Sequence, residues 1–275
     1  MMKSEADNRQ RVIIVTGACR GIGKAITETF VDNGDLVAMV SENKNELLKT
    51  AASVSNPNNV LVLDGDLAID DFVDEIVEAT YSKWGKIDVL INNAAWRTIE
   101  TLNTISRENW EKTLKVCLTS PVFLSKMAAK KMKSGNRGGV IIHLSSVMAN
   151  RAGGTSPAYI AAKGALLSLT YEMAALYGPS GIRVLAVCPG NVTTAMSSDF
   201  KDSKGSNISQ LLVEEMEDMT PLQRSASPEE IAEGVFWLSS NKASFINGTS
   251  LDIDGGFAHN FNSYKSKKKQ FPNEF

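Results

Sequence analysis

Short, nearly continuous apolar segments rich in β-branched residues alternate along this chain with longer segments of helical periodicity. Six of these apolar segments are predicted strands: Arg11–Thr16, Leu36–Val40, Val60–Leu63, Ile87–Ile91, Val140–Leu144 and Ile182–Val187. They lack the apolar–polar alternation of a half-exposed strand, as expected when helices cover both faces of a parallel sheet. The segments between them are long enough for crossover helices. The sequence therefore predicts an α/β fold with a doubly wound, mostly parallel sheet.

One domain is expected over residues 11–258, after a polar extension at residues 1–10. No Gly/Ser-rich or Pro-rich linker divides the 275 residues, and 43% of them are hydrophobic, which is enough for a large core. The segment of residues 195–219 is long and carries many charges, which predicts a substrate lid. The alternative is a surface excursion, that is, a surface loop without a role in binding. The lysine-rich tail at residues 259–275 is expected to be flexible or to contact a partner.

The charge balance and the few cysteines and histidines exclude several function classes. The 29 Lys+Arg against 31 Asp+Glu give a net charge of -2, without the basic footprint of a nucleic-acid partner. Cys19, Cys117 and Cys188 are far apart, which excludes a disulfide framework and a Cys-rich zinc site and suits a reducing compartment. With only His143 and His259, neither a histidine metal site nor a Ser-His-Asp triad is expected. Without a signal core or an 18-residue apolar run, we expect a cytoplasmic protein with no membrane partner.

A glycine-rich turn, TGACRGIG, follows the first predicted strand and opens a helix near Ile22. Glycines allow the backbone to turn tightly and approach a pyrophosphate, while the helix N-terminus supplies N–H donors and a positive dipole. Its position between a strand and a helix favours a dinucleotide site over an ordinary connection. The expected contacts are Gly17, Arg20, Gly21, Ile22 and Gly23.

The end of the second predicted strand bears on the choice between NAD and NADP. Glu42 could accept a hydrogen bond from a ribose hydroxyl and would repel a 2′-phosphate, which favours NAD. Ser41, Arg20 and Lys44 could instead hold a phosphate, so NADP remains an alternative.

Tyr159 and Lys163 are four residues apart, so on a helix they share one face. An ammonium about 4 Å from a phenolate stabilises it by roughly 4 kcal/mol at an effective dielectric of 20. This is the same order as the cost of ionising a tyrosine at neutral pH. The pair could therefore act as a general acid and base without histidine. Ser146 follows the strand Val140–Leu144, at the edge of the sheet where ligands bind in open parallel sheets.

With these motifs in this order, the chain resembles the short-chain dehydrogenase/reductase family from Val12 to about Phe257. The resemblance rests on the glycine turn, Asn92-Asn93-Ala94, Ser146, Tyr159 with Lys163, Pro189-Gly190 with Thr194, and Asp252-Ile253-Asp254-Gly255-Gly256. It implies a single Rossmann-like domain with seven strands and an NAD(P)-dependent oxidation of an alcohol, or the reverse reduction. It also implies a homotetramer, in which the segment Asp252–Gly256 contributes to an interface.

The resemblance also implies roles for individual residues. Tyr159 would be the acid/base, Ser146 would hydrogen-bond the substrate oxygen, and Lys163 would favour the phenolate and bind the nicotinamide ribose. Further cofactor contacts would come from Asp66 and Leu67 at the adenine, Asn93 and Ala94 near the ribose, and Pro189, Gly190, Val192 and Thr194 around the nicotinamide.

Two positions depart from the family pattern. Cys117 stands where the family has an asparagine whose backbone carbonyl holds a proton-relaying water, so the helix kink and the relay are in doubt. A buried thiol that fills the asparagine site is favoured over a reactive one. Ala95 replaces a usual glycine, which is a smaller change.

The substrate is expected to be a sugar, a polyol or another hydroxylated small molecule. Trp96, Ser146, Met148, Asn191 and Met196 are expected around it, with Asn150 and Arg151 near the pocket mouth. Arg97 and Arg151 would suit a polar or anionic substrate, or lie at a solvated surface. The alternatives are an NADPH-dependent 3-oxoacyl carrier-protein reductase and a catalytically silent dinucleotide-binding or scaffold protein.

Overall fold

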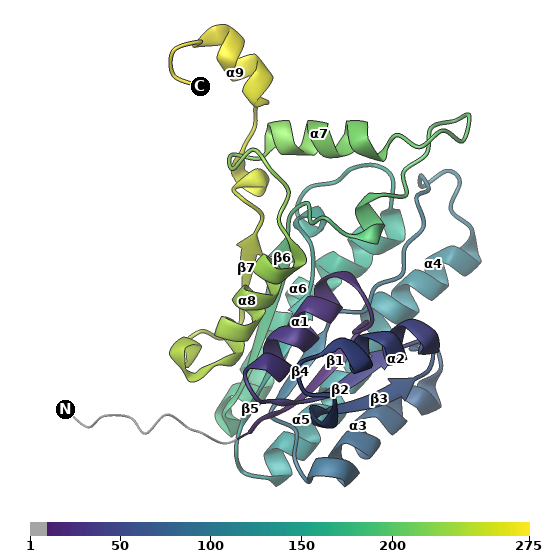
Figure 1. Ribbon diagram of the computed structural model, residues 1–275, viewed down its shortest axis with the longest axis vertical. Helices are drawn as coiled ribbons and strands as arrows, with labels where there is room; N and C mark the ends of the chain where they lie inside the picture. The colour runs from purple at the N-terminus through teal and green to yellow at the C-terminus, as the bar shows by residue number, and fades with distance from the viewer. Residues whose placement is uncertain (1–9) are drawn as a thin grey trace, which may run out of the picture.

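A seven-stranded parallel sheet forms the centre of the computed structural model, which describes residues 10–275 (Figure 1). The strand order is β3-β2-β1-β4-β5-β6-β7, and every neighbouring pair is parallel. The strands are β1 (Val12–Thr16), β2 (Leu36–Ser41), β3 (Val60–Asp64), β4 (Val89–Asn92), β5 (Gly139–Leu144), β6 (Ile182–Pro189) and β7 (Thr249–Ile253). The predicted doubly wound α/β fold is confirmed. All but Gln10 of the expected polar extension lies outside the described residues.

Helices cover both faces of the sheet, so its central strands are buried on each side. All five residues of β1 are buried; Ile13 and Val15 face one core, and Ile14 faces the other. The first core contains residues of α1 (Gly21–Asp32), α2 (Lys44–Ser53) and α8 (Pro228–Ser239). The second contains residues of α3 (Asp70–Trp84), α5 (Ser120–Ser134) and α6 (Pro157–Tyr177). This two-sided burial explains why the strand sequences lack apolar–polar alternation.

The edge strand β7 was not among the six strand segments predicted from the sequence. None of its five residues is fully buried, so it lacks the continuous apolar signature that marked the others. The start of β4 also differs, because the predicted strand began at Ile87. There the Asp88 carboxylate accepts a hydrogen bond from the Val12 amide at 2.7 Å, and regular pairing begins at Val89.

Two further helices lie beyond the carboxyl ends of the strands, at the top of Figure 1. The predicted lid segment contains α7 (Ser209–Met219). The lysine-rich tail contains α9 (Tyr264–Gln270), a helix that was not predicted from the sequence. Ser263 caps α9 by accepting a hydrogen bond from the Ser266 amide at 3.2 Å. The Lys265 amide donates to Asp218 on α7 at 2.9 Å, so the tail contacts the lid segment. None of the helices within residues 10–275 is long and apolar enough to cross a membrane.

Candidate active site

The glycine turn between β1 and α1 is packed too closely for side chains. Gly17 has a φ of +67°, and a Cβ on Gly23 would lie 2.1 Å from the Gly17 carbonyl oxygen. Asn93, just after β4, holds the turn by donating from Nδ2 to the Thr16 carbonyl at 2.8 Å. The N-terminus of α1 has no side-chain cap, so its first N–H groups are available to an anion. The turn therefore suits the pyrophosphate of a dinucleotide.

The loop after β6 lies against this turn. A Cβ on Gly21 would be 3.2 Å from Cγ2 of Thr194. Gly190 is more tightly confined, because its Cβ would lie 2.8 Å from Cα of Asp254. Val192 is buried, and Asn93 and Ala94 both donate their backbone N–H to Oγ1 of Thr16 at 3.0 Å. The segments that follow β1, β4 and β6 thus meet at the carboxyl edge of the sheet.

At the end of β2, Ser41 and Lys44, two of the three groups that could hold a 2′-phosphate, already have partners. The Ser41 hydroxyl donates to Sγ of Cys19 at 3.1 Å and accepts from the Asn43 amide at 3.2 Å. Lys44 Nζ forms an ion pair with Asp64 at 3.2 Å. Glu42 is exposed. Arg20, the other cation that could hold a 2′-phosphate, is exposed at the N-cap of α1.

Asp66 and Leu67, the expected adenine contacts, lie just after β3. Oδ1 of Asp66 accepts a hydrogen bond from the Ala68 amide at 2.8 Å. Leu67 is buried, and its carbonyl accepts from the Ser120 hydroxyl at 2.5 Å. These contacts fix the backbone of the loop that follows β3.

Tyr159 and Lys163 lie on the same face of α6, near the carboxyl end of β5. Lys163 Nζ is 5.4 Å from the centroid of the Tyr159 ring, and only 9% of Tyr159 and 2% of Lys163 are exposed. Nζ donates to the Leu144 carbonyl, the last of β5, at 2.5 Å. A positive charge held this close to the ring can stabilise the charge that develops on the phenol oxygen during a proton transfer. The geometry therefore suits proton transfer at Tyr159.

Ser146 is placed by the same strand end. The Ser145 hydroxyl donates to the Lys163 carbonyl at 2.8 Å, which ties the end of β5 to α6. Oγ of Ser146 accepts from the Met148 amide at 3.1 Å and retains its own proton for donation. The end of β5 thus connects Ser146 to the helix that carries Tyr159 and Lys163.

Cys117 lies in a π-helical turn, Lys115–Thr119, between α4 (Arg107–Leu114) and α5. Its Sγ accepts from the Trp96 amide and donates to the Trp96 carbonyl, both at 3.3 Å. It packs in a cluster with Tyr159 and Ala162. Burial raises the pKa of the thiol, which outweighs the opposing effect of the Lys163 charge. Cys117 is therefore a buried hydrogen-bonding group, and the helix is irregular at this point without the asparagine.

The expected substrate contacts do not all lie together. Met148 packs against the Cys117–Tyr159 cluster, and Met196 is exposed at the start of the lid segment. Trp96 is half-buried, with Lys112 Nζ 4.9 Å from its ring centroid. Asn150 is exposed.

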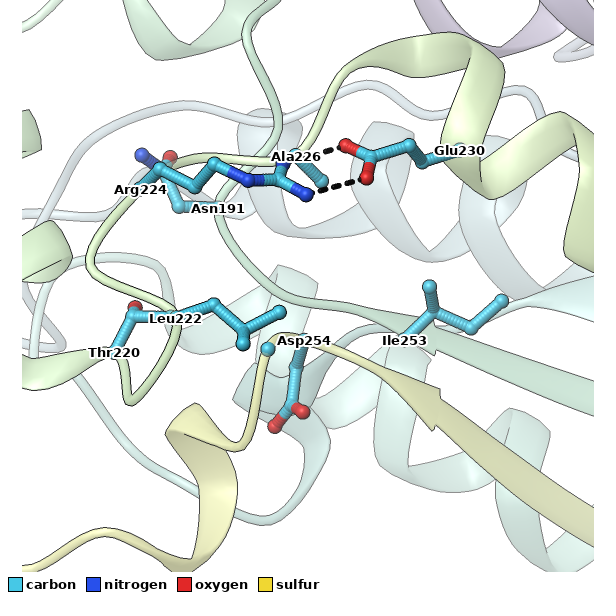
Figure 2. A pocket seen from close by; sticks show the side chains of 9 residues that line it. Asn191, Thr220, Leu222, Arg224, Ala226, Glu230, Ile253 and Asp254 are labelled. Carbon is cyan, nitrogen blue, oxygen red and sulfur yellow. Dashed lines mark hydrogen bonds and ion pairs between the residues drawn. The ribbon is translucent and has the colours of Figure 1, made fainter.

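Asn191 instead lines a separate cavity of about 90 Å³ (Figure 2). Its Nδ2 donates to the Ser225 hydroxyl at 2.8 Å. A bidentate ion pair between Arg224 and Glu230 borders this cavity, with bonds of 2.7 and 2.6 Å. The cavity is lined by none of Ser146, Tyr159 and Lys163.

A buried polar pair behind the site was missed by the sequence reasoning. Nδ2 of Asn92 lies 3.1 Å from Nδ1 of His143 and donates to the Ser125 hydroxyl at 3.1 Å. Burial, and then the charge of Lys163, lower the pKa of His143 to about 3, so its ring is neutral. The available signal was a histidine inside an otherwise apolar strand. No cluster of side chains that could hold a metal ion occurs in the part of the chain that the structure describes.

Comparison with known proteins identifies the family. A family model described as "Enoyl-(Acyl carrier protein) reductase" matches residues 17–258. L-rhamnose 1-dehydrogenase (NAD(P)(+)) of Azotobacter vinelandii is 33% identical over 252 residues, which cover 90% of this chain and 96% of that protein.

Two solved structures share the fold closely. L-sorbose reductase from Gluconobacter frateurii, complexed with NADPH and L-sorbose, has a TM-score of 0.84 and 29% identity, covering 92% of this chain and 98% of that one. A 3-ketoacyl-(acyl-carrier-protein) reductase from Brucella melitensis, complexed with NADH, has a TM-score of 0.81 and 26% identity, covering 90% and 98%. The chain belongs to the short-chain dehydrogenase/reductase family. It is an NAD(P)-dependent oxidoreductase that acts on an alcohol or the corresponding ketone.

Proposed function

We propose that this enzyme oxidises a secondary alcohol of a sugar, a polyol or a related hydroxylated metabolite, or reduces the matching ketone. The observation that carries the proposal is the buried pair of Tyr159 and Lys163 at the carboxyl end of β5. The rhamnose dehydrogenase and the sorbose reductase, which are similar to this chain over most of its length, support a polyhydroxylated substrate.

In the oxidative direction, the Tyr159 phenolate accepts the proton of the substrate hydroxyl. The Ser146 hydroxyl donates a hydrogen bond to the same substrate oxygen, and Lys163 stabilises the phenolate while the Leu144 carbonyl holds its ammonium. The dinucleotide, when bound, supplies the hydride acceptor. Cys117 orients the segment at Trp96 through its two hydrogen bonds.

We propose NAD as the preferred cofactor. Glu42 is exposed at the end of β2, while Ser41 and Lys44 are engaged with Cys19 and Asp64. The negative charge of Glu42 would repel a 2′-phosphate, and of Arg20 and Lys44 only Arg20 would be available to bind it. Both observations favour NAD, which has a ribose hydroxyl at this position. Asp66, Leu67, Asn93, Ala94, Pro189, Gly190, Val192 and Thr194 would line the rest of the dinucleotide site.

A homotetramer in the cytoplasm is proposed for the whole protein. β7 is an edge strand, and nearby apolar side chains are exposed: Leu251 at 37%, Trp237 at 42% and Phe245 at 103%. Such exposed apolar groups are typical of an interface. The three free cysteines suit a reducing compartment.

The reduction of a 3-oxoacyl group on a carrier protein is the second candidate. The description of the matching family model and the Brucella structure favour it. An acidic carrier needs a basic docking surface, and the net charge of -2 gives no general support for one.

The test is the reduction of NAD⁺ and NADP⁺, followed at 340 nm, with a library of sugars, polyols and hydroxy acids. A 3-oxoacyl thioester with NADPH is assayed in parallel. We expect turnover of a polyhydroxylated compound with a higher kcat/KM for NAD⁺ than for NADP⁺. Turnover confined to the thioester would reject the proposed substrate class, and a preference for NADP⁺ would reject the role of Glu42.

A further inference from the structure

The backbone around Arg97 is fixed on both sides. On one side, the amide and carbonyl of Trp96 are both hydrogen-bonded to Sγ of Cys117, at 3.3 Å. On the other side, the Thr98 carbonyl accepts from the Ser156 hydroxyl at 3.2 Å, just before the helix that carries Tyr159. The backbone that carries the Arg97 side chain is therefore held next to the cluster that contains Cys117 and Tyr159.

The guanidinium itself has few partners for a half-buried charge. Nη2 donates to the Met196 carbonyl at 2.8 Å, and Cζ lies 5.2 Å from the centroid of the Phe200 ring. Within residues 10–275 the side chain makes no ion pair and no other hydrogen bond, although a guanidinium carries five N–H donors. Burial lowers the Arg97 pKa, while the negative charges of an ionised Tyr159 and of Asp199 raise it. The charge is thus partly desolvated, close to Tyr159, and lacks a bonded anion.

Arg151, the other arginine near the site, is different. Its Nη1 donates to the Phe257 and Asn260 carbonyls, and its Cζ lies 4.6 Å from the Phe257 ring centroid. Arg151 therefore holds the segment before α9, whereas most donors of Arg97 are unused.

We propose that Arg97 binds a carboxylate of the substrate, so that the enzyme acts on a hydroxy acid of the sugar-acid type. This inference rests on the proposed function, because it places the anion on the molecule whose hydroxyl meets Tyr159. A guanidinium fork matches a carboxylate in a bidentate, charge-assisted geometry. One guanidinium also balances the single charge of a carboxylate better than the nearly double charge of a phosphate. Asp199 weakens the attraction without pairing with Arg97.

The test measures binding to the enzyme–NADH complex by calorimetry. The probes are gluconate, galactonate, xylonate and arabinonate, each compared with the uncharged alditol of the same configuration, and glucose 6-phosphate. We expect at least one aldonate to bind about tenfold or more tightly than its alditol and more tightly than the phosphate. Arg97→Gln should weaken the binding of that aldonate by about 10- to 100-fold and change the affinity for the alditol by less than about threefold.

Three further variants separate the local contact from general charge. Arg97→Lys should restore part of the lost aldonate affinity, because it keeps the charge without the fork. Asp199→Asn should tighten aldonate binding several-fold. Arg107→Gln removes a positive charge from a side chain that is 89% exposed on α4, and it should leave every affinity unchanged.

An aldonate-to-alditol ratio near one, or a ratio that Arg97→Gln leaves unchanged, would overturn the inference. Tighter binding of the phosphate would also overturn it. If Arg97→Gln does not fold, the aldonate-to-alditol affinity ratio of the wild type and the aldonate affinity of Arg97→Lys still test the inference. The proposed function fails separately, if no compound in the turnover library is oxidised or reduced in a reaction that requires Tyr159.

Discussion

Replacement of Gly23 by alanine sets two physical effects against each other. Gly23 lies in the first turn of α1, where alanine is intrinsically favoured in a helix by about 1 kcal/mol. The added Cβ would lie 2.1 Å from the Gly17 carbonyl oxygen and 2.5 Å from Nδ2 of Asn93. Because side-chain carbons do not approach other atoms closer than 3.0 Å, the turn has to move by about 1 Å. Overpacking of this kind costs about 1–3 kcal/mol.

Steric overlap opposes helix propensity, and the difference leaves Gly23→Ala destabilised by up to about 2 kcal/mol. For a chain of this size, that lowers the melting temperature by up to about 8 °C. The same movement displaces the pyrophosphate donors, and a misplacement of about 1 Å can cost up to 100-fold in function. We expect NADH affinity to fall by at least about tenfold.

Gly164→Ala is the matched control, because Gly164 is also helical but a Cβ there would be 3.9 Å from its nearest neighbour, the Ala149 carbonyl oxygen. Helix propensity alone then acts, and the melting temperature should rise by about 2–4 °C with NADH affinity unchanged. Scanning calorimetry and fluorescence titration with NADH measure both effects. Equal stability and NADH affinity in Gly23→Ala and wild type would refute the steric reasoning.

Two other perturbations test the surroundings of the site. Cys117→Ala removes the thiol that bonds both the amide and the carbonyl of Trp96, and it should lower the free energy of unfolding by about 1–3 kcal/mol, measured by thermal unfolding. Cys117→Asn keeps a donor and an acceptor and should therefore lower it by less. Equal losses of stability in the two variants would contradict the role of these bonds. The pKa of His143, lowered to about 3, means that the unfolded chain binds more protons between about pH 3 and the ordinary histidine pKa of about 6.5. Stability should therefore fall as the pH drops through this window, and the fall should be shallower in His143→Gln; parallel pH curves would exclude this contribution.

The fold and the edge of the sheet that carries the site were predictable because they depend on local patterns. Burial on both faces makes a strand continuously apolar, and the TGACRGIG segment needs its glycines for its own turn. The carboxyl ends of parallel strands share the edge of the sheet where ligands bind, so Ser146, which follows a predicted strand, could be placed at that edge from the sequence.

Contacts between distant segments were not predictable in this way. Tertiary packing determines three of these contacts: the hydrogen bond from Lys163 to the Leu144 carbonyl, the bonds between Cys117 and Trp96, and the bond from Arg97 to Met196. Helix α9 is short, with a weak local signal, and it packs against α7 through the bond from Lys265 to Asp218. The separate cavity at Asn191 likewise forms where the segments after β6 and α7 meet the start of α8 and the end of β7, which only the fold brings together.

Single-turnover hydride transfer in Tyr159→Phe tests the catalytic proposal most directly. The substitution removes one hydroxyl from a buried ring and leaves the glycine turn intact, so NADH should bind with unchanged affinity. With a substrate found in the library screen, the rate of coenzyme reduction at saturation should fall by about 100-fold or more, as expected for a lost general base. A rate within a few-fold of wild type, with the cofactor bound, would contradict proton transfer at Tyr159.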